Sequence, residues 1–324
     1  MGGKRTGGYG SVIKVQELMS QQHDTKYYAR KQAKCNGQAV LERERELICK
    51  LPDNPHLIRL RASYMHKNCL TLILDPWADY DLNSILINPK QLSLPLHGKC
   101  LGEQIVRSMP CIVSAVAVLH AHRIKHKDIK PHNILIVFDN KKIVPILCDF
   151  GVSKKFDSNS KTAGGEGTTF YQAPECLCGR RAGREADIFS LGCVFLEILT
   201  FLCGKRGKLM KNIGKMGFAQ YLSDPIRYDA AFNLVNGSSS WWARVVDIVK
   251  LMIVQECSDR PSADFIWKRL CEIEVSEGRE PHCSHKAIGS LACDSSSGTS
   301  RLATMVRGIP LSLNTRSMNS LDTT

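Results

Sequence analysis

The stretch HKDIKPHN, residues 126–133, holds one carboxylate, one amide, two lysines and two imidazoles within eight positions. It follows an apolar stretch with helical spacing, so Asp128, Lys130 and Asn133 fall close together on a turn of the chain. A solvated turn would have this composition. A site that handles phosphate, a metal ion and a hydroxyl proton would have it as well, and the rest of the chain must decide between the two.

The length and composition are those of an ordinary globular protein. The chain has 324 residues, of which 43% are hydrophobic and 23% charged, enough for two lobes with sizeable cores. The longest apolar runs, 111–122 and 191–203, are too short to span a bilayer, so we expect no membrane segment. The fourteen cysteines are scattered, with no CxxC pair, which favours an intracellular protein with reduced thiols. We expect a cytoplasmic location and leave nuclear entry open.

The net charge of +13 lies in the globular part, because residues 276–324 carry five Lys or Arg against four Asp or Glu. Such a charge is compatible with nucleic acid, an anionic membrane or acidic substrates. The densest basic stretch, GKRGKLMKNIGK (204–215), has no interleaved aromatic residue, which argues against a nucleic-acid partner. We expect this stretch to be a solvated loop.

Two regions with different periodicity follow each other along the chain. Residues 10–75 alternate short β-like runs with turns and include one helical stretch at 39–51. Residues 98–122 have helical spacing, and short strands follow within 133–150. From about position 187 onward, three more helical stretches follow one another. This order predicts a small β-rich part followed by a larger helical part.

The last 49 residues differ from both regions. Fifteen of them are Ser or Thr, and no apolar periodicity is sustained. A segment of this kind buries too little apolar surface to offset the entropy of ordering. We therefore predict that residues 276–324 form a disordered tail.

A glycine-rich turn lies near the start of the chain. The stretch TGGYGSVIKV (6–15) places Gly7, Gly8 and Gly10 between β-like runs. Backbone N–H groups in such a turn can approach a phosphate closely, because glycine has no Cβ atom. An ordinary hairpin has the same composition, so this turn alone decides nothing.

A strand lysine and a helix glutamate follow the glycine-rich turn. Lys31, in YYARK (27–31), could hold the phosphates of a nucleotide. Glu44, in LERERELICKL (41–51), is its candidate partner on the next helix, since a carboxylate would fix the ammonium in one place. A charged helix face would also contain these glutamates.

A second polar stretch, CDFG (148–151), follows HKDIKPHN (126–133) along the chain. Asp128 could accept a proton from an attacking hydroxyl, and Lys130 could neutralise a moving phosphoryl group. Asn133 and Asp149 offer hard oxygen ligands of the kind that Mg²⁺ prefers, and two short strands would bring them to one edge of a hairpin. Phosphoryl transfer needs this set of groups.

In this order, the motifs resemble the eukaryotic protein kinase family of the Ser/Thr type. GTTFYQAPE (167–175), DIFSLG (187–192) and DRP (259–261) complete a resemblance that spans residues 5–275. Each motif alone is modest, but seven motifs in the family order make a chance match negligible. The resemblance also implies protein substrates.

The resemblance implies an α+β fold, the two-lobed protein kinase fold. A small β-rich N-lobe is joined through a hinge to a larger, mostly helical C-lobe, with ATP in the cleft between them. The implied boundaries are the kinase domain at 1–275, the N-lobe at 1–74, the hinge at 75–80 and the C-lobe at 81–275. The first strand of the N-lobe is expected to be truncated.

The resemblance further implies transfer of the γ-phosphoryl group of ATP to Ser or Thr hydroxyls of proteins, with Mg²⁺. Asp128 matches the catalytic base of the family and Lys130 the lysine typical of Ser/Thr kinases. Lys31 matches the phosphate-binding lysine. Asn133 and Asp149 match the magnesium ligands.

Further positions match the ATP site of the family. Glu44 matches the helix partner of Lys31. The other ATP-binding candidates come from the glycine loop, the apolar walls around adenine, the hinge and the acid near the ribose: Gly7, Gly8, Gly10, Val12, Ala29, Asp75, Trp77, Asp81 and Leu135.

The chain departs from the family pattern at four positions. Arg5 stands where the first glycine of the loop is expected, and Lys127 replaces the arginine of the HRD motif. His132 stands where arginine-directed relatives carry Glu, which favours acidic targets. Val152 follows DFG and is β-branched, which in the family accompanies a preference for Thr.

Two interpretations of the function follow. The complete set of Lys31, Asp128, Asn133 and Asp149 favours an active kinase. Arg5 and the shortened first strand favour the alternative, a pseudokinase that acts as a scaffold or allosteric partner with weak or no ATP turnover.

Overall fold

The computed structural model describes most of the chain through position 280. The described ranges are 4–6, 10–17, 26–34, 37–96, 98–139, 142–155, 169–180, 182–235 and 240–280. Residues 1–287 form one compact unit, and every element below belongs to it. The predictions for Gly7, Gly8 and nearly all of the tail fall outside the described residues.

The N-terminal region is one antiparallel sheet with the order β1-β2-β3-β5-β4. Its strands are β1 (Lys4–Thr6), β2 (Gly10–Gln16), β3 (Tyr27–Ala33), β4 (Arg59–His66) and β5 (Cys69–Asp75). β4 and β5 form a hairpin whose turn residues Lys67 and Asn68 both have positive φ, at 48° and 58°. Such turns match the right-handed twist of the paired strands. The β-like runs of the sequence are therefore strands, as predicted.

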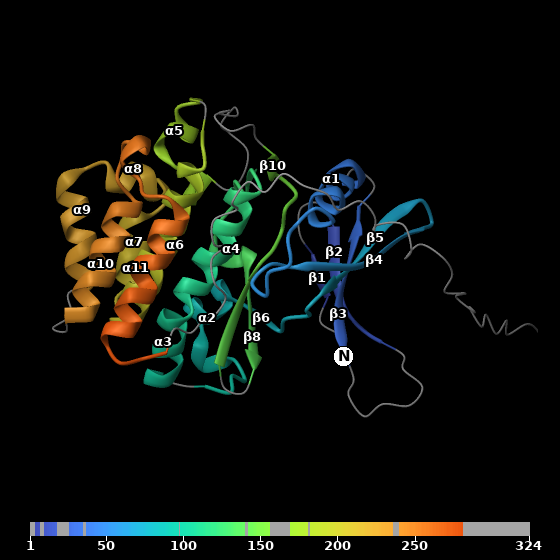
Figure 1. The fold of residues 1–324 in the computed structure, drawn as a ribbon, viewed down its shortest axis with the longest axis horizontal. Coiled ribbons are helices and arrows are strands. Elements are labelled where there is room, and N and C mark those ends of the chain that lie inside the picture. Colours follow the sequence, from blue (N-terminus) through green and yellow to red (C-terminus); the bar gives the residue numbers. More distant parts are fainter. Residues whose placement is uncertain are drawn as a thin grey trace, which may run out of the picture. The chain divides into compact units, whose positions relative to one another are not determined.

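Helix α1 (Gln38–Ile48) lies beside this sheet and contacts β4 and β5 (Figure 1). Its buried residues Leu41, Glu44, Leu47 and Ile48 recur at helical spacing and form the face toward the sheet. Glu44 is thus carried inward by the same periodicity that buries its apolar neighbours. The helix ends three residues before the predicted position 51.

The second region is mostly helical, and most of the helices in Figure 1 belong to it. The helices that follow α1 are α2 (Leu82–Ile87), α3 (Gly98–Arg107), α4 (Met109–Ala121), α5 (Pro174–Leu177), α6 (Glu185–Leu202), α7 (Arg206–Ile213), α8 (Phe218–Leu222), α9 (Pro225–Phe232), α10 (Ser240–Met252) and α11 (Ala263–Ser276). Helices α4 and α6 are buried on nearly every side, with α11 packed on α4 and α10 packed on α6. Two central helices therefore form the core of this region, and the predicted α+β class is confirmed.

One predicted helix is in fact two. Residues 98–122 were expected to be continuous, but α3 ends at Arg107 and α4 starts at Met109. Pro110 has no N–H group to continue the ladder, and at the break the Ser108 hydroxyl donates to the carbonyl of Ile105 at 2.7 Å. The stretch Cys100–Ala121 is long and apolar enough to cross a membrane by length and composition, but 78% of its most apolar window is buried inside the protein.

A second prediction also fails, because the basic stretch 204–215 is not a loop. It contains helix α7, whose apolar residues Leu209 and Ile213 are completely buried. Spacing of four residues puts both on one face, and this packing outweighs the run of basic charge from which a solvated loop was predicted. The lysines are left on the exposed side.

Short strands connect the two regions. β6 (Tyr80–Asp81), β8 (Ile134–Asp139) and β9 (Lys142–Leu147) form one small sheet, and β7 (Ile124–Lys125) pairs with β10 (Lys154–Lys155). The end of β9 is bound to the chain before β4. The Leu147 N–H donates to the His56 carbonyl at 2.8 Å, and the Ile58 N–H donates to the Leu147 carbonyl at 3.1 Å.

A buried ion pair fastens α5 to the helical region. The two terminal guanidinium nitrogens of Arg260, Nη1 and Nη2, donate to the two carboxylate oxygens of Glu175, at 2.8 and 2.9 Å. The Arg260 side chain is fully buried, and three backbone carbonyls accept its remaining bonds. A planar guanidinium satisfies such a carboxylate with two parallel bonds.

We expect Arg260→Met to lower the free energy of unfolding by about 3–5 kcal/mol, because it leaves a buried carboxylate without its cation. Arg260→Lys should cost less, since one charge remains but the paired bonds are lost. Urea unfolding monitored by circular dichroism measures both. Arg269→Met is the matched control, because its pair with Glu272 is exposed. Equal midpoints for Arg260→Met and this control would contradict the prediction.

Candidate active site

Lys31 on β3 and Glu44 on α1 form the predicted pair. The Lys31 Nζ atom lies 2.8 Å from Glu44 Oε1 and 2.7 Å from Oε2. The Glu44 side chain is 2% exposed and that of Lys31 is 17% exposed. Because β3 and α1 hold one partner each, the pair fixes the helix against the sheet and the ammonium in one position.

Asp149 is a third member of this cluster, with Oδ1 3.1 Å from Lys31 Nζ. Burial disfavours the charge of Lys31, but the carboxylates of Glu44 and Asp149 outweigh burial and raise its pKa above the ordinary value. Burial acts to raise the pKa of Asp149, but the nearby Lys31 ammonium outweighs it and the net shift is downward. Both groups are therefore charged at neutral pH.

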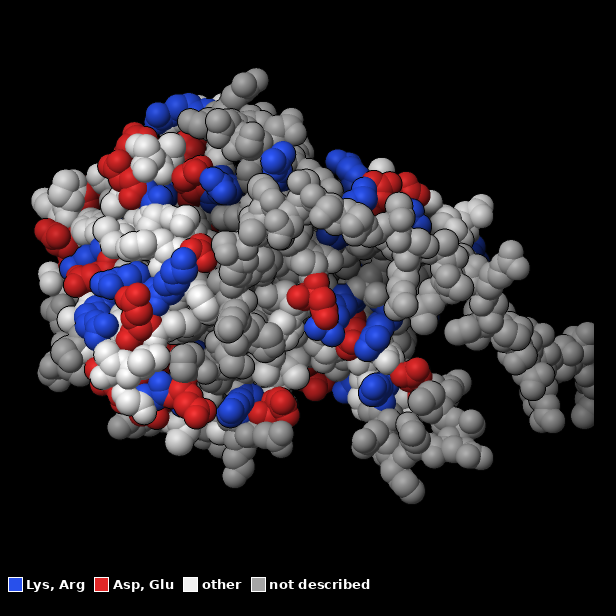
Figure 2. Space-filling view, viewed as in Figure 1, with Lys and Arg blue, Asp and Glu red and all other residues white. Residues whose placement is uncertain are grey.

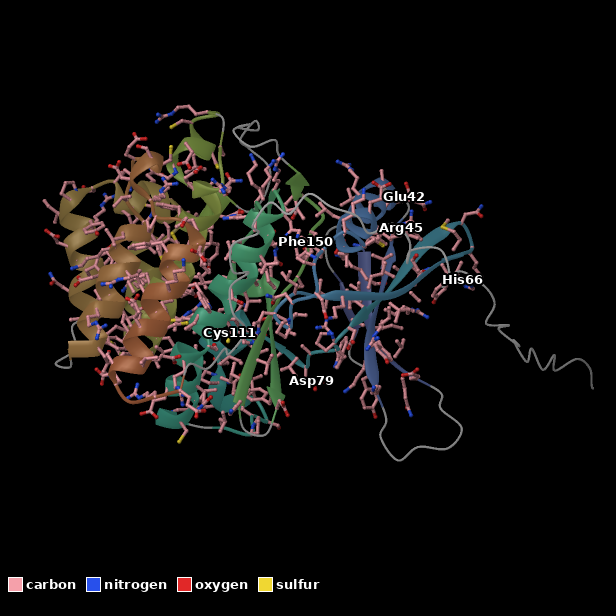
Figure 3. The ribbon with its side chains drawn as sticks, in the orientation of Figure 1. Glu42, Arg45, His66, Asp79, Cys111 and Phe150 are labelled. Carbon is pink, nitrogen blue, oxygen red and sulfur yellow. The ribbon has the colours of Figure 1, made fainter. Side chains whose placement is uncertain are left out.

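The backbone around Asp149 has an uncommon conformation. Its φ is +69°, in the left-handed region that non-glycine residues seldom adopt. The next residue, Phe150, is 1% exposed, and its ring lies 5.1 Å from that of His126, centroid to centroid. Figure 3 shows Phe150 between the N-terminal sheet and the helical region. Burial of Phe150 compensates the strain and directs the Asp149 carboxylate toward Lys31.

Asp128, Lys130 and Asn133 converge as the sequence predicted. The Lys130 ammonium lies 2.6 Å from Asp128 Oδ2. The Asn133 Nδ2 atom donates to the same oxygen at 3.0 Å and to the Asp128 backbone carbonyl at 2.8 Å. A short 3-10 turn, Pro131–Asn133, brings Asn133 back to Asp128. A solvated turn would not hold its carboxylate with two side-chain donors at once.

Asp187, the third residue of α6, holds the backbone of residues 126 and 127 by hydrogen bonds. Its Oδ2 atom accepts from the His126 N–H at 2.9 Å, and its Oδ1 atom accepts from the Lys127 N–H at 2.8 Å. Lys127 has a φ of +69°, so these bonds stabilise a second strained residue. His120 also bonds to Asp187, at 2.9 Å. No local pattern pointed to His120, because a histidine near a helix end is common.

Lys125 is a second residue that the sequence analysis missed. It is 1% exposed, and its Nζ atom donates to the Ala182 carbonyl at 3.1 Å. Burial lowers its pKa below the ordinary value. Lys125 thus ties β7 (Ile124–Lys125), just before residues 126–133, the proposed catalytic loop, to the segment after α5. The position of Lys125 directly after Ile124, in a short strand, could have indicated from the sequence that its side chain is buried.

The expected adenine-contacting residues line up across the strands. Val12 is paired with Lys31, and Ala29 is paired with Leu74, so these side chains share one face of the sheet. Leu135 on β8 is paired with Asp81 on β6. Val12 and Leu135 are only partly buried, as walls of a cleft would be.

The predicted hinge residues have partners within the protein. Asp75 accepts from Arg61 at 3.0 Å, and the Trp77 ring N–H donates to Asp79 at 2.8 Å. The Asp81 carboxylate caps α2 by accepting from the Ser84 N–H at 2.8 Å. Gly10 is the first residue of β2. Two side chains of the hinge are therefore held, Asp75 by Arg61 of β4 and Trp77 by Asp79.

Asn133 and Asp149 fit the chemistry of a magnesium site. The Cys148 N–H donates to the Asn133 carbonyl at 3.0 Å, which places the two candidate ligands side by side. Asn133 uses its Nδ2 atom toward Asp128, so its amide oxygen is directed elsewhere. The Asp149 side chain is 46% exposed. Carboxylate and amide oxygens are ligands that Mg²⁺ accepts.

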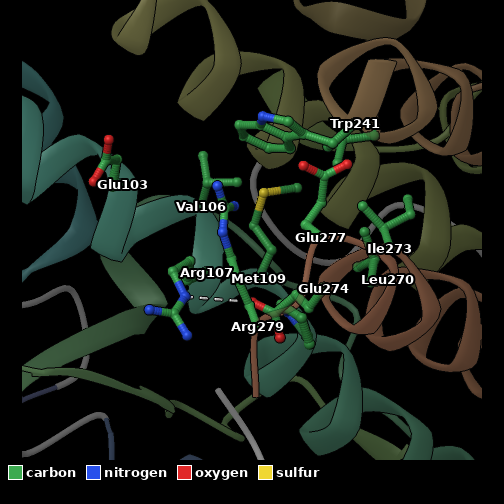
Figure 4. A pocket seen from close by; sticks show the side chains of 12 residues that line it. Glu103, Val106, Arg107, Met109, Trp241, Leu270, Ile273, Glu274, Glu277 and Arg279 are labelled. Atoms are coloured by element: carbon green, nitrogen blue, oxygen red, sulfur yellow. Dashed lines mark ion pairs between the residues drawn. The ribbon is translucent and has the colours of Figure 1, made fainter. Parts of the chain in front are cut away.

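The cavity in Figure 4 is separate from this cluster. It measures about 340 Å³ and is lined by residues of α3, α4, α10 and α11 together with the chain just after α11. Arg107 and Glu274 face each other in it at 3.7 Å, and Arg279 lies over the Trp241 ring at 5.5 Å. It contains none of the predicted catalytic residues.

Comparison with known proteins agrees with the geometry. The family model described as protein kinase domain matches residues 5–270, and the chain belongs to this family and has its two-lobed fold. Serine/threonine-protein kinase AtPK2/AtPK19 of Arabidopsis thaliana is 34% identical over 197 residues, 58% of this chain and 39% of that protein. Calcium-dependent protein kinase 5 of Plasmodium falciparum is 31% identical over 258 residues, 77% of this chain and 40% of that protein.

A further relative is serine/threonine-protein kinase fused of Drosophila melanogaster, 30% identical over 198 residues, 59% of this chain and 22% of that protein. The chain thus spans about two fifths or less of the length of these relatives.

We expect Lys31→Met to lower the free energy of unfolding at pH 7 by about 3 kcal/mol or more, because it leaves the Glu44 carboxylate buried without a cation. Burial already raises the folded-state pKa of Glu44 in the wild type, although the Lys31 ammonium acts to lower it, so the loss of Lys31 raises this pKa further. The folded variant therefore binds that proton more tightly than the unfolded chain does. The loss of stability should shrink as the pH falls from neutral toward the ordinary pKa of Glu, about 4.3. Urea unfolding at several pH values measures the trend.

The paired variant Lys31→Met with Glu44→Leu is the control for this prediction. It removes both charges, so it should recover part of the stability that Lys31→Met loses. A paired variant less stable than Lys31→Met at pH 7 would show that the ion pair is not the cause.

For Lys125, burial lowers the folded-state pKa below the unfolded value, so the unfolded state binds more protons in that range. The stability of the wild type relative to Lys125→Met should therefore rise between pH 7 and about pH 9.5. Urea unfolding of both proteins tests this. The same comparison with Lys268→Met, an exposed lysine, should show no such rise. A constant or falling difference for Lys125→Met would refute the assignment.

Proposed function

We propose that this chain is an active protein serine/threonine kinase, which transfers the γ-phosphoryl group of ATP to Ser or Thr hydroxyls of proteins. The observation that carries the proposal is the formed Lys31 cluster. Its ammonium contacts Glu44 and Asp149 together, at distances of 2.7–3.1 Å. A kinase requires this pair and this aspartate to be in place for catalysis.

Asp128 is the proposed catalytic base, which orients the acceptor hydroxyl and receives its proton. Its carboxylate is held by Lys130 and Asn133, so it reaches the acceptor in a fixed direction. The Lys130 ammonium beside it offsets the charge that develops on the transferred group. Asp187 keeps the loop in place through its backbone N–H groups.

Lys31 is proposed to hold the phosphates of ATP, with the apolar walls Val12, Ala29 and Leu135 around the adenine. Asn133 and Asp149 would hold Mg²⁺, which supplies charge neutralisation on the phosphates when bound. These groups act by position and charge, and no covalent intermediate on the protein is needed.

Protein substrates with acidic residues and a Thr acceptor are part of the proposal. His132 is exposed and carries no carboxylate to attract basic residues near the acceptor. Val152 follows the DFG stretch, and a β-branched residue there accompanies Thr preference in the family. A peptide array that returned basic, Ser-centred sequences would contradict both preferences.

The test is transfer of radiolabelled phosphate from ATP and Mg²⁺ to an acidic protein and to the chain itself. We expect incorporation by the wild type and a decrease of about 10²–10⁴-fold in Asp128→Asn, since the base is lost while the fold is kept. Equal incorporation by both proteins would show that Asp128 is not the base.

A thermal-shift measurement on the same samples decides the remaining outcome. If the wild type is folded and transfers no phosphate to any substrate, the chain is a pseudokinase and the proposed activity is wrong. Arg5 in β1, paired with Val12 across the sheet, would then be the first residue to replace with glycine.

A further inference from the structure

The segment between Glu197 and Asp224 contains no acidic residue and five basic ones. It covers the end of α6, helix α7 and helix α8. On the face of the molecule shown in Figure 2, basic and acidic side chains are interspersed over the helical region. The five basic residues are Lys205, Arg206, Lys208, Lys211 and Lys215.

Arg206 has a structural role that separates it from the four lysines. Its Nε atom donates to Oε1 of Glu197 at 2.7 Å, and the Glu197 side chain is completely buried. The other carboxylate oxygen accepts from the Tyr171 hydroxyl at 2.8 Å. Arg206 therefore anchors the start of α7 to α6 and to the segment just before α5.

The four lysines are exposed, and none of them forms an ion pair with any residue in the described ranges. Lysines on other helices do have acidic neighbours, such as Lys250 with Asp247 at 3.6 Å and Lys268 with Asp264 at 2.8 Å. Lys208 and Lys211 are three residues apart on α7, so two like charges are neighbours on the helix, which destabilises it slightly. Lys205 lies just before the helix and Lys215 just after it. We call Lys205, Lys208, Lys211 and Lys215 the α7 basic face.

The α7 basic face is fixed relative to the proposed active site. Helix α6 carries Asp187, which holds the catalytic loop, and Glu197, which anchors Arg206. Ten residues of helix separate these two, a distance of about 15 Å along the axis. An extended peptide covers that distance in about five residues.

Packing of α8 gives a second connection. The Phe218 ring lies 5.5 Å from that of Phe170 and 5.4 Å from that of Tyr171, centroid to centroid. Gly217, with φ of +79°, approaches the Phe170 backbone so closely that a Cβ atom would lie 3.1 Å from its carbonyl oxygen. The chain that follows α7 is therefore packed against residues 169–171, on the path from the DFG stretch to α5.

We propose that the α7 basic face docks an acidic stretch of the protein substrate, about five or more residues away from the acceptor. The proposal rests on the kinase function above and names the substrate feature that this surface would select. The occupant is a carboxylate-rich peptide segment, because the exposed lysines of the α7 basic face offer four ammonium groups for carboxylates to contact. Opposite charges there would speed encounter and fix register.

Other polyanions fit the surface less well. The apolar residues Leu209 and Ile213 are fully buried, so α7 presents no apolar face to enter a membrane. Residues 204–215 contain no aromatic side chain on which a base could stack. Nucleic acid and anionic lipid are therefore outcomes that the test must separate from a peptide.

The test compares three proteins. The first is the wild type, and the second replaces all four lysines of the α7 basic face with Gln, a good helix former. The third is a matched control that removes four exposed lysines elsewhere: Lys50, Lys90, Lys142 and Lys268, each to Gln. The control has the same net charge as the second protein.

The substrates are peptides that share one acceptor sequence. One set carries four Asp residues starting about six residues from the acceptor, on its N-terminal or C-terminal side, and the reference set carries Asn there. We expect the wild type to show a KM about tenfold lower for an acidic peptide, since four exposed ion pairs of modest strength add up. The kcat should be unchanged, and the KM advantage should shrink between about 50 and 200 mM salt.

The α7 variant should lose this difference in KM, while the lysine control should keep it. Acidic peptides preferred equally by all three proteins would overturn the proposal. Fluorescence polarisation of a labelled acidic peptide measures docking without turnover. If the wild type binds this peptide and the α7 variant does not, docking is supported. If the wild type also transfers no phosphate to any peptide, the kinase function is rejected while docking stands.

Competition identifies the class of ligand. The competitors are a short DNA duplex, vesicles with anionic lipid and the unlabelled acidic peptide, compared at equal concentrations of negative charge. Displacement of the labelled peptide by DNA or vesicles at a lower concentration than the unlabelled peptide requires would overturn the assignment to a protein substrate. We expect the peptide to compete best.

Discussion

A lysine ammonium buried in a protein is stabilised most strongly by carboxylates placed next to it. In this chain such an arrangement joins three elements, because Lys31 comes from β3, Glu44 from α1 and Asp149 from the chain after β9. Any movement of α1 away from the sheet would leave a buried charge unpaired. The position of α1 and the direction of Asp149 are thus set by one electrostatic constraint.

Helix α6 transmits a similar constraint through the helical region. Asp187 near its start holds the proposed catalytic loop, and Glu197 further along holds Arg206 and Tyr171. A rigid helix keeps these two anchor points at a fixed separation. The loop that would act on the acceptor and the basic surface that would dock the substrate are therefore positioned by the same buried element.

Sequence reasoning succeeded where a local pattern carries the information. The apolar spacing of α1 and α6 and the alternation of the strands follow from periodicities that the sequence displays directly. The prediction for residues 204–215 was wrong because the burial of Leu209 and Ile213 in α7 outweighs the run of basic charge. The prediction of one helix at 98–122 was wrong because Pro110 divides it into two near Ser108. Lys125 and His120 were missed because their partners, Ala182 and Asp187, lie far away in the sequence.

The sequence by itself determined which residue types are present and in what order, and this was enough for the family, the α+β class and the set Lys31, Asp128, Asn133 and Asp149. Only the tertiary structure decided that Lys31 meets Glu44 and Asp149 together, because a distance between residues far apart in the chain depends on how whole elements pack. It also decided which charges are paired. Arg206 is held by Glu197 while its neighbouring lysines stay exposed, since burial on α6 selects one of five similar side chains.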